Sequence, residues 1–173
     1  MSDISTFKFT CSCCDEIHRG VPNLGSNAPN YYFSIPDEEI KKRTFLTSDT
    51  CVIDDVHFFV RGCLEIPLIG HEEVFSFGAW VSLSKENFEK FESLYDVKQR
   101  RDNEPMFGWF SSWVWPFYTD TENIKSIIHL RNDGIRPYIE LEPTEHPLAL
   151  LQSEGISSEQ VIKMYEYYVH GKK

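Results

Sequence analysis

The chain has 173 residues, 41% of them hydrophobic and 25% charged, which is typical of a globular protein with a buried core. Its formal net charge of −10 argues against nucleic acid as a partner, because phosphate contacts require clustered lysine and arginine. No long apolar run and no apolar leader in residues 1–9 are present, so we expect no membrane contact and a cytoplasmic location. In that reducing compartment, metal binding is a commoner use of the five cysteines than disulfides.

Residues 1–35 are predicted to be a loop-rich segment that carries a Cys/His knuckle. Cys11 and Cys14 stand at Cys-x-x-Cys spacing, and His18 follows four residues later. Because thiolates at this spacing can share one tetrahedral ion, we predict a structural zinc with these three ligands. The alternatives are a metal-free turn of packing residues and a redox pair. The fourth ligand is left open between a water molecule and three further cysteines, Cys13, Cys51 and Cys63.

A sheet-forming body is predicted over residues 36–156. It begins with a short helix over 37–43, whose carboxylates suit the positive end of the helix dipole. Alternation with period two predicts strands over 57–66 and 75–83, joined as a hairpin. Ser84 is the expected N-cap of the helix that follows.

A second hairpin is specified by the Asp-Gly dipeptide in residues 132–135, which is typical of a two-residue type I′ turn. This register places Ile128 opposite Ile139 and His129 opposite Tyr138. It also sets Lys125 against Glu142, so apolar residues meet apolar ones and a cation meets a carboxylate.

A C-terminal helix is predicted over residues 157–170. Ser157 and Gln160 form a capping box, and Gly171 ends the helix. Antiparallel hairpins followed by a helix indicate a single α+β domain over 1–173. We expect an antiparallel sheet with its helices packed on one side.

Six segments of the chain carry a family resemblance. They are the knuckle and residues 51–54, 59–67, 80–84, 105–109 and 136–149. Together they are similar to the bacterial family called domain of unknown function 2199, over about Phe9 to Ile156. In that family the knuckle reads Cys-x-x-Cys-Gly-x-x-His, whereas here Asp15 replaces the glycine and Cys13 adds a thiol. Aspartate tolerates a positive φ better than most residues. The resemblance implies no activity and no catalytic residues.

Residues 140–147 combine carboxylates with an imidazole, and Glu142 and His146 are the candidates for acid–base chemistry or ligand binding. The alternative is turn chemistry, in which Thr144 caps a short helix ending at Leu151.

Two further groups are candidate binding residues. Arg61 and Glu65 lie on the polar face of the strand over 57–66, where they form either a buried structural pair or part of a site. Trp109 and Trp113 belong to an aromatic-rich stretch that could be a core corner or an interface.

The leading hypothesis is a non-enzymatic binding or regulatory protein with a structural zinc, because no catalytic constellation is complete in the sequence. Its partner is expected to be a protein or a small molecule, for example a basic toxin for which this acidic chain is the inhibitor or immunity protein. The rival hypothesis is a hydrolase, either metal-dependent or built on a carboxylate–histidine pair.

Overall fold

The computed structural model describes residues 7–117 and 119–171. By its internal contacts the chain divides into two compact units. The terminal unit comprises Met1–Leu24, Glu65–Phe77 and Pro143–Lys173, and the sheet unit comprises Gly25–Leu64 and Gly78–Glu142. The α+β class is confirmed. The interpretation of residues 1–173 as one domain stays a prediction.

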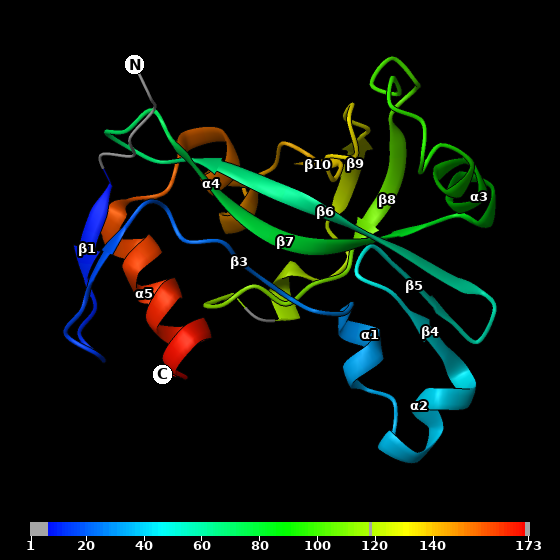
Figure 1. The fold of residues 1–173 in the computed structure, drawn as a ribbon, viewed down its shortest axis with the longest axis horizontal. Coiled ribbons are helices and arrows are strands. Elements are labelled where there is room, and N and C mark those ends of the chain that lie inside the picture. The colour runs from blue at the N-terminus through cyan, green and yellow to red at the C-terminus, as the bar shows by residue number, and fades with distance from the viewer. Residues whose placement is uncertain (1–6, 118, 172–173) are drawn as a thin grey trace. The chain divides into compact units, whose positions relative to one another are not determined.

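One mixed sheet has the strand order β3-β7-β8-β9-β10-β6-β5-β4 (Figure 1). β6 also pairs with β7, so the five strands from β7 through β8, β9 and β10 to β6 form a closed ring. The strands span Leu24–Gly25 (β3), Thr44–Leu46 (β4), Thr50–Ile53 (β5), His57–Pro67 (β6), Val74–Leu83 (β7), Met106–Phe110 (β8), Lys125–His129 (β9) and Tyr138–Leu141 (β10).

The expectation of a purely antiparallel sheet is wrong, because β10 and β6 are parallel, with Tyr138 opposite Cys63. The ring itself explains the parallel pair. Neighbours β7–β8, β8–β9 and β9–β10 are antiparallel, and the short β6–β7 connection makes that pair antiparallel too. Strand direction cannot alternate all the way around a ring with an odd number of strands, so one pair must run in the same direction.

Both predicted central strands are present, as β6 and β7. Alternate residues of β7 form one apolar face that is buried throughout: Phe75, Phe77, Ala79, Val81 and Leu83. Trp80 lies on the opposite face, with Ser76 and Ser82, yet it is fully buried as well. Its Nε1–H donates to the carbonyl of Ser26 at 3.0 Å, which satisfies the one polar atom of the ring. Trp80 belongs to a buried cluster with Ile35, Cys51, Ile53 and Phe59.

The predicted register of the second hairpin is confirmed. Tyr138 stands opposite His129 and Ile139 opposite Ile128. The turn residues Asp133 and Gly134 have φ values of +60° and +74°. Positive φ at both central positions is what a type I′ turn requires, and it matches the twist of the flanking strands.

Three α-helices lie in the sheet unit: α1 (Asn30–Phe33), α2 (Asp37–Arg43) and α3 (Lys85–Ser93), with a 3₁₀ turn, η1, at Thr119–Thr121. The helix predicted over 37–43 is confirmed as α2, with carboxylates in its first turn and cations in its last. Ser84 caps α3 by accepting a hydrogen bond from the backbone N–H of Asn87, as expected.

The terminal unit contains the hairpin of β1 (Lys8–Thr10) and β2 (Ile17–Arg19) and the helices α4 (Pro147–Glu154) and α5 (Ser158–His170). In Figure 1, β1 lies beside α5. The capping box of Ser157 and Gln160 and the left-handed Gly171 at the end of α5 are confirmed. Since α4 and α5 belong to this unit and α1–α3 to the other, the expectation that all helices pack on one side of the sheet stays a prediction. Among the residues described, no helix has the length and apolarity needed to cross a bilayer.

Candidate metal centre

The knuckle is the connection of the β1–β2 hairpin, in which Phe9 stands opposite His18. The N–H of Cys11 donates to the carbonyl of Glu16 at 3.0 Å, and the N–H of Asp15 donates to the carbonyl of Cys11 at 2.9 Å. Asp15 has φ of +57°. The turn therefore does require a left-handed residue at the position where the similar family carries glycine.

Backbone amides surround the two knuckle thiols. The N–H of Cys13 points at Sγ of Cys11 at 3.4 Å. Burial raises the pKa of Cys11, but hydrogen bonds from the backbone of Cys13 and Cys14 and from the Cys14 thiol outweigh it and lower that pKa overall. A backbone hydrogen bond from Glu16 lowers the pKa of Cys14, yet burial and the adjacent Cys11 sulfur together raise it. Amides aimed at sulfur stabilise the thiolate, which is the form that binds metal.

His18 is held beside Cys14 by two aromatic rings. Its Nε2 lies 3.5 Å from Sγ of Cys14. The imidazole stacks on Phe9 with ring centroids 5.2 Å apart, and the ring of Tyr165 from α5 lies 4.9 Å away. The hydroxyl of Tyr165 is 3.5 Å from the same Nε2. The position of this imidazole thus depends on both β1 and α5.

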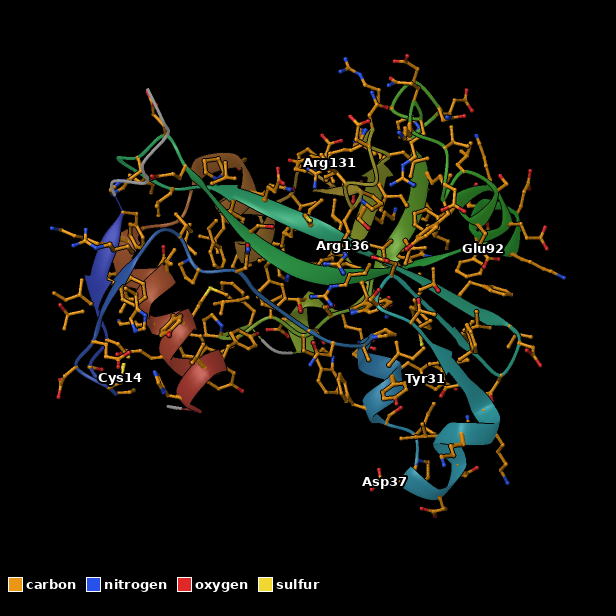
Figure 2. All side chains as sticks on the ribbon, viewed as in Figure 1. Cys14, Tyr31, Asp37, Glu92, Arg131 and Arg136 are labelled. Atoms are coloured by element: carbon orange, nitrogen blue, oxygen red, sulfur yellow. The ribbon has the colours of Figure 1, made fainter. Side chains whose placement is uncertain are left out.

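His170, the last residue of α5, joins the knuckle from the far end of the sequence. The sulfur atoms of Cys11 and Cys14 and a ring nitrogen of His170 all lie within 4.8 Å of one another. Ligand atoms of Cys14, Glu16 and His18 form a second group within the same limit. The two groups share the Cys14 sulfur, which Figure 2 locates.

A third group contains Cys11, Cys13 and Glu166. Glu166 is buried, and its Oε2 accepts hydrogen bonds from the backbone N–H of Ser12, at 2.9 Å, and from the Ser12 hydroxyl. The carboxylate is therefore engaged in holding the knuckle loop against α5. Cys11, Cys14 and His170 offer two sulfur donors and one imidazole nitrogen in one group, and His18 adds a second imidazole beside the Cys14 sulfur. Sulfur and imidazole donors are those that zinc prefers.

The fourth zinc ligand is left open in the sequence analysis. Neither Glu166 nor His170 is among the candidates there. Cys13 lies in the knuckle and is exposed. Cys51 and Cys63 belong to the sheet unit, on β5 and β6. Burial raises the pKa of Cys51 to about 12, so this thiol stays protonated and packs as an apolar side chain. One feature of the sequence could have drawn attention to His170. It lies in the last turn of a helix whose two ends are clearly marked by capping residues.

The other candidate residues have the following surroundings. His146 is the N-cap of α4, and its Nδ1 accepts a hydrogen bond from the N–H of Leu148 at 3.1 Å. Thr144, the expected cap, instead accepts a hydrogen bond from the N–H of His146. Glu142 is exposed and its N–H donates to the carbonyl of Lys125, in the predicted register.

Arg61 and Glu65 are both half-buried on β6 and fall in different units. Nε of Arg61 is buried and has no hydrogen-bond partner within residues 7–117 and 119–171. Its guanidinium lies against Gly78, where a Cβ atom would come within 2.7 Å of Nη2. Gly78 therefore makes room for the Arg61 side chain.

The aromatic-rich stretch is partly exposed. Phe107 and Trp109 project from β8 with ring centroids 5.1 Å apart, and Trp113 donates from Nε1 to Glu122 at 3.0 Å. With Ile127 on β9, opposite Phe107, they form what we call the aromatic face. The exposed fractions of these side chains are 47% for Phe107, 41% for Trp109, 41% for Trp113 and 39% for Ile127.

Comparison with known families matches residues 10–156 to a family described as an uncharacterized protein conserved in bacteria, domain of unknown function 2199. The chain belongs to this family. The match begins at the knuckle and covers most of the 173 residues, so the resemblance drawn from sequence motifs is confirmed. Comparisons with curated proteins and with solved structures find no match.

Proposed function

We propose that this member of the family is a non-enzymatic binding protein whose N-terminal hairpin is fastened to α5 by a structural zinc ion. The observation that carries the proposal is the meeting of Cys11, Cys14 and His170 within 4.8 Å, with His18 against the Cys14 sulfur. Four protein ligands fill a tetrahedral ion and leave no position for substrate or activated water, which is typical of structural zinc.

The hydrolase alternative has less support from the surroundings of its residues. A metal-dependent hydrolase needs an open coordination position, which a fourth protein ligand would occupy. In a carboxylate–histidine hydrolase, His146 would need an unprotonated nitrogen that faces a substrate to act as a base. Its Nδ1 accepts a hydrogen bond from the N–H of Leu148 as the N-cap of α4, so the proton of the neutral ring is on Nε2.

The aromatic face supports a protein partner. Phe107, Trp109 and Ile127 form an exposed cross-strand patch on β8 and β9, and Trp113 follows β8 in the sequence. Aromatic residues contribute most of the binding energy in many interfaces. The patch is bordered by carboxylates. Glu122 is bonded to Trp113, and Glu140 stands opposite Ile127. With a net charge of −10, this favours a basic protein as the partner, such as a toxin that the chain inhibits.

The zinc centre is tested by the metal content of protein purified without added zinc. We expect stoichiometric zinc in the wild type, its loss in Cys11→Ser and a marked reduction in His170→Gln. The matched control is His129→Gln, which removes a half-buried histidine of the sheet unit paired with Glu140. Negligible zinc in the wild type overturns the centre. Zinc retained in His170→Gln but lost in Cys13→Ser overturns this ligand set.

The binding role is tested by a photo-crosslinking amino acid at Phe107, with Val56, another exposed apolar residue of the sheet unit, as the control position. We expect crosslinking in living cells to capture a basic protein at Phe107 only. With the purified pair, Trp109→Ser should weaken affinity by about tenfold or more. An acidic partner, or affinity unchanged in Trp109→Ser, overturns this assignment.

A further inference from the structure

The sheet unit contains a cavity of about 480 Å³ at the C-terminal end of α3, which we call the Asp49 cavity. Its walls are the segment after α3, the turn of the β9–β10 hairpin and the loop between β4 and β5. Its lining includes apolar Phe91 and Pro137 and the polar side chains of Asp49, Tyr95, Lys98 and Arg136. A volume of this size suits a small organic molecule.

The walls of this cavity are fixed by a buried cation. Arg100 is 3% exposed, and its guanidinium donates to backbone carbonyls at both walls. The acceptors are the carbonyls of Leu94, Tyr95, Arg131 and Ile135, at 2.8–3.2 Å. The N–H of Asp133 also donates to the carbonyl of Lys98. A site held in place before its ligand arrives loses less entropy on binding.

The carboxylate of Asp49 is fully engaged at one end of the cavity. It accepts from Nε of Arg136 at 2.8 Å, from the hydroxyl of Tyr95 at 2.7 Å and from the Ser48 hydroxyl at 3.2 Å. Burial raises the pKa of Asp49, but the hydrogen bonds from Arg136 and Tyr95 outweigh it and lower that pKa overall. Asp49 therefore stays ionised and positions Arg136.

Arg136 keeps donors available for a ligand. Within the described part of the chain, its terminal amino groups Nη1 and Nη2 make no hydrogen bond, and its side chain is 40% exposed. Figure 2 labels this side chain. A guanidinium presents its N–H groups in a planar fork that matches a carboxylate.

A second arginine adds to the positive charge here. The backbone N–H of Arg61 donates to the carbonyl of Asp49 at 2.9 Å, and its buried Nε has no hydrogen-bond partner among the residues described. Burial, and after it the positive charge of Arg136, lowers the pKa of Arg61. The lining itself carries three cations, Lys98, Arg100 and Arg136, and three carboxylates, Asp49, Asp96 and Asp133. Arg61 is outside the lining but adjoins it through Asp49, so it brings the local net charge to one positive charge.

We propose that the Asp49 cavity binds a small-molecule carboxylate, with its anionic group on Arg136 near Arg61 and its apolar part against Phe91 and Pro137. The single surplus charge matches a monoanion. Asp96 and Asp133 also line the cavity and disfavour a phosphate dianion. This site is independent of the zinc centre and of the aromatic face.

The test uses benzoate as the probe, with benzyl alcohol as its uncharged analogue and inorganic phosphate as the rival anion. Binding is followed by NMR of the backbone amides of Tyr95, Lys98 and Gly134 in the full chain. We expect benzoate to shift these amides saturably and benzyl alcohol to leave them unmoved. Shifts from benzyl alcohol equal to those from benzoate, no shift from benzoate, or tighter binding of phosphate would each overturn the proposal.

Arginine variants test where the carboxylate of benzoate binds. Arg136→Gln should weaken benzoate about tenfold, and Arg61→Gln should weaken it by a smaller factor. The control Arg101→Gln removes an exposed arginine that is outside the lining and should leave affinity unchanged. Arg136→Lys guards against misfolding, because it keeps the charge but loses the fork, and it should weaken binding with a native spectrum. If Arg136→Gln, Arg61→Gln and Arg136→Lys all bind benzoate as tightly as the control Arg101→Gln, the site is refuted.

Discussion

Two of the antiparallel hairpins of this protein, β9–β10 and β1–β2, are held in different ways. The β9–β10 hairpin is set by its own sequence, through cross-strand pairs and an Asp-Gly turn, and it lies between neighbouring strands of the sheet. The β1–β2 hairpin has strands of only three residues in a two-stranded sheet. Two-stranded hairpins are marginal on their own. Its stability therefore depends on partners far along the sequence, namely Tyr165, Glu166 and His170 on α5.

The largest expected effect that separates the two hairpins is that of zinc removal. A chelator should raise the hydrogen-exchange rate of the β1–β2 amides by about 100-fold, or roughly 3 kcal/mol of local opening free energy, because metal binding supplies the folding energy of such sites. The β9–β10 amides should change little. Exchange measured by mass spectrometry on metal-loaded and metal-stripped protein gives both values at once. Equal protection of β1–β2 in the two forms would mean that the hairpin does not depend on metal.

A loss of stability of nearly the same size is expected from a substitution on β8, the strand that pairs with β9. Gly108 on β8 pairs with Ser126, and a Cβ atom there would lie 2.3 Å from Cγ1 of Val81 and 2.4 Å from the carbonyl oxygen of Ser82. Because backbone cannot move aside easily, Gly108→Ala should lower the free energy of unfolding by about 3 kcal/mol. Urea denaturation measures this loss. If Gly108→Ala lowers the free energy of unfolding by less than alanine at the exposed turn residue Gly134 does, the sheet accommodates the added methyl group more readily than its geometry indicates.

The contrast also explains which features could be predicted from sequence. The β9–β10 register, α3 and α5 were predictable because their signals are local: an Asp-Gly turn, the Ser84 cap and the Ser157–Gln160 capping box. A Cys/His cluster at the knuckle that could hold a metal ion was predictable for the same reason. The presence of His170 in that cluster was not, because only tertiary structure brings a helix end to the knuckle. The parallel β10–β6 pair was missed because it follows from closure of the whole ring and not from any one segment.

A smaller effect that distinguishes the two hairpins is the loss of stability caused by a glycine-to-alanine substitution beside each of them. Gly134 and Gly20 both have positive φ, +74° and +85°, with open space around an added Cβ. Alanine at either position should therefore cost about 1 kcal/mol of backbone strain. Gly134→Ala should reduce global stability in urea. Gly20→Ala should leave global stability unchanged and raise only the exchange rate of β1–β2 amides, since that hairpin opens locally. Equal losses of global stability would show that both hairpins unfold with the whole chain.

The smallest expected effect is at the knuckle turn. Asp15 occupies a left-handed position at φ of +57°, where glycine carries no steric penalty. Asp15→Gly should therefore stabilise the bound hairpin by about 0.5 kcal/mol and tighten zinc by about twofold, whereas Asp15→Ala should weaken zinc. Competition with a chromogenic chelator resolves a difference of this size. Asp15 also carries a negative charge within the knuckle, so its removal takes a carboxylate away from the loop that would hold the ion. If Asp15→Gly weakens zinc, the charge of the aspartate contributes more to the site than its backbone conformation costs.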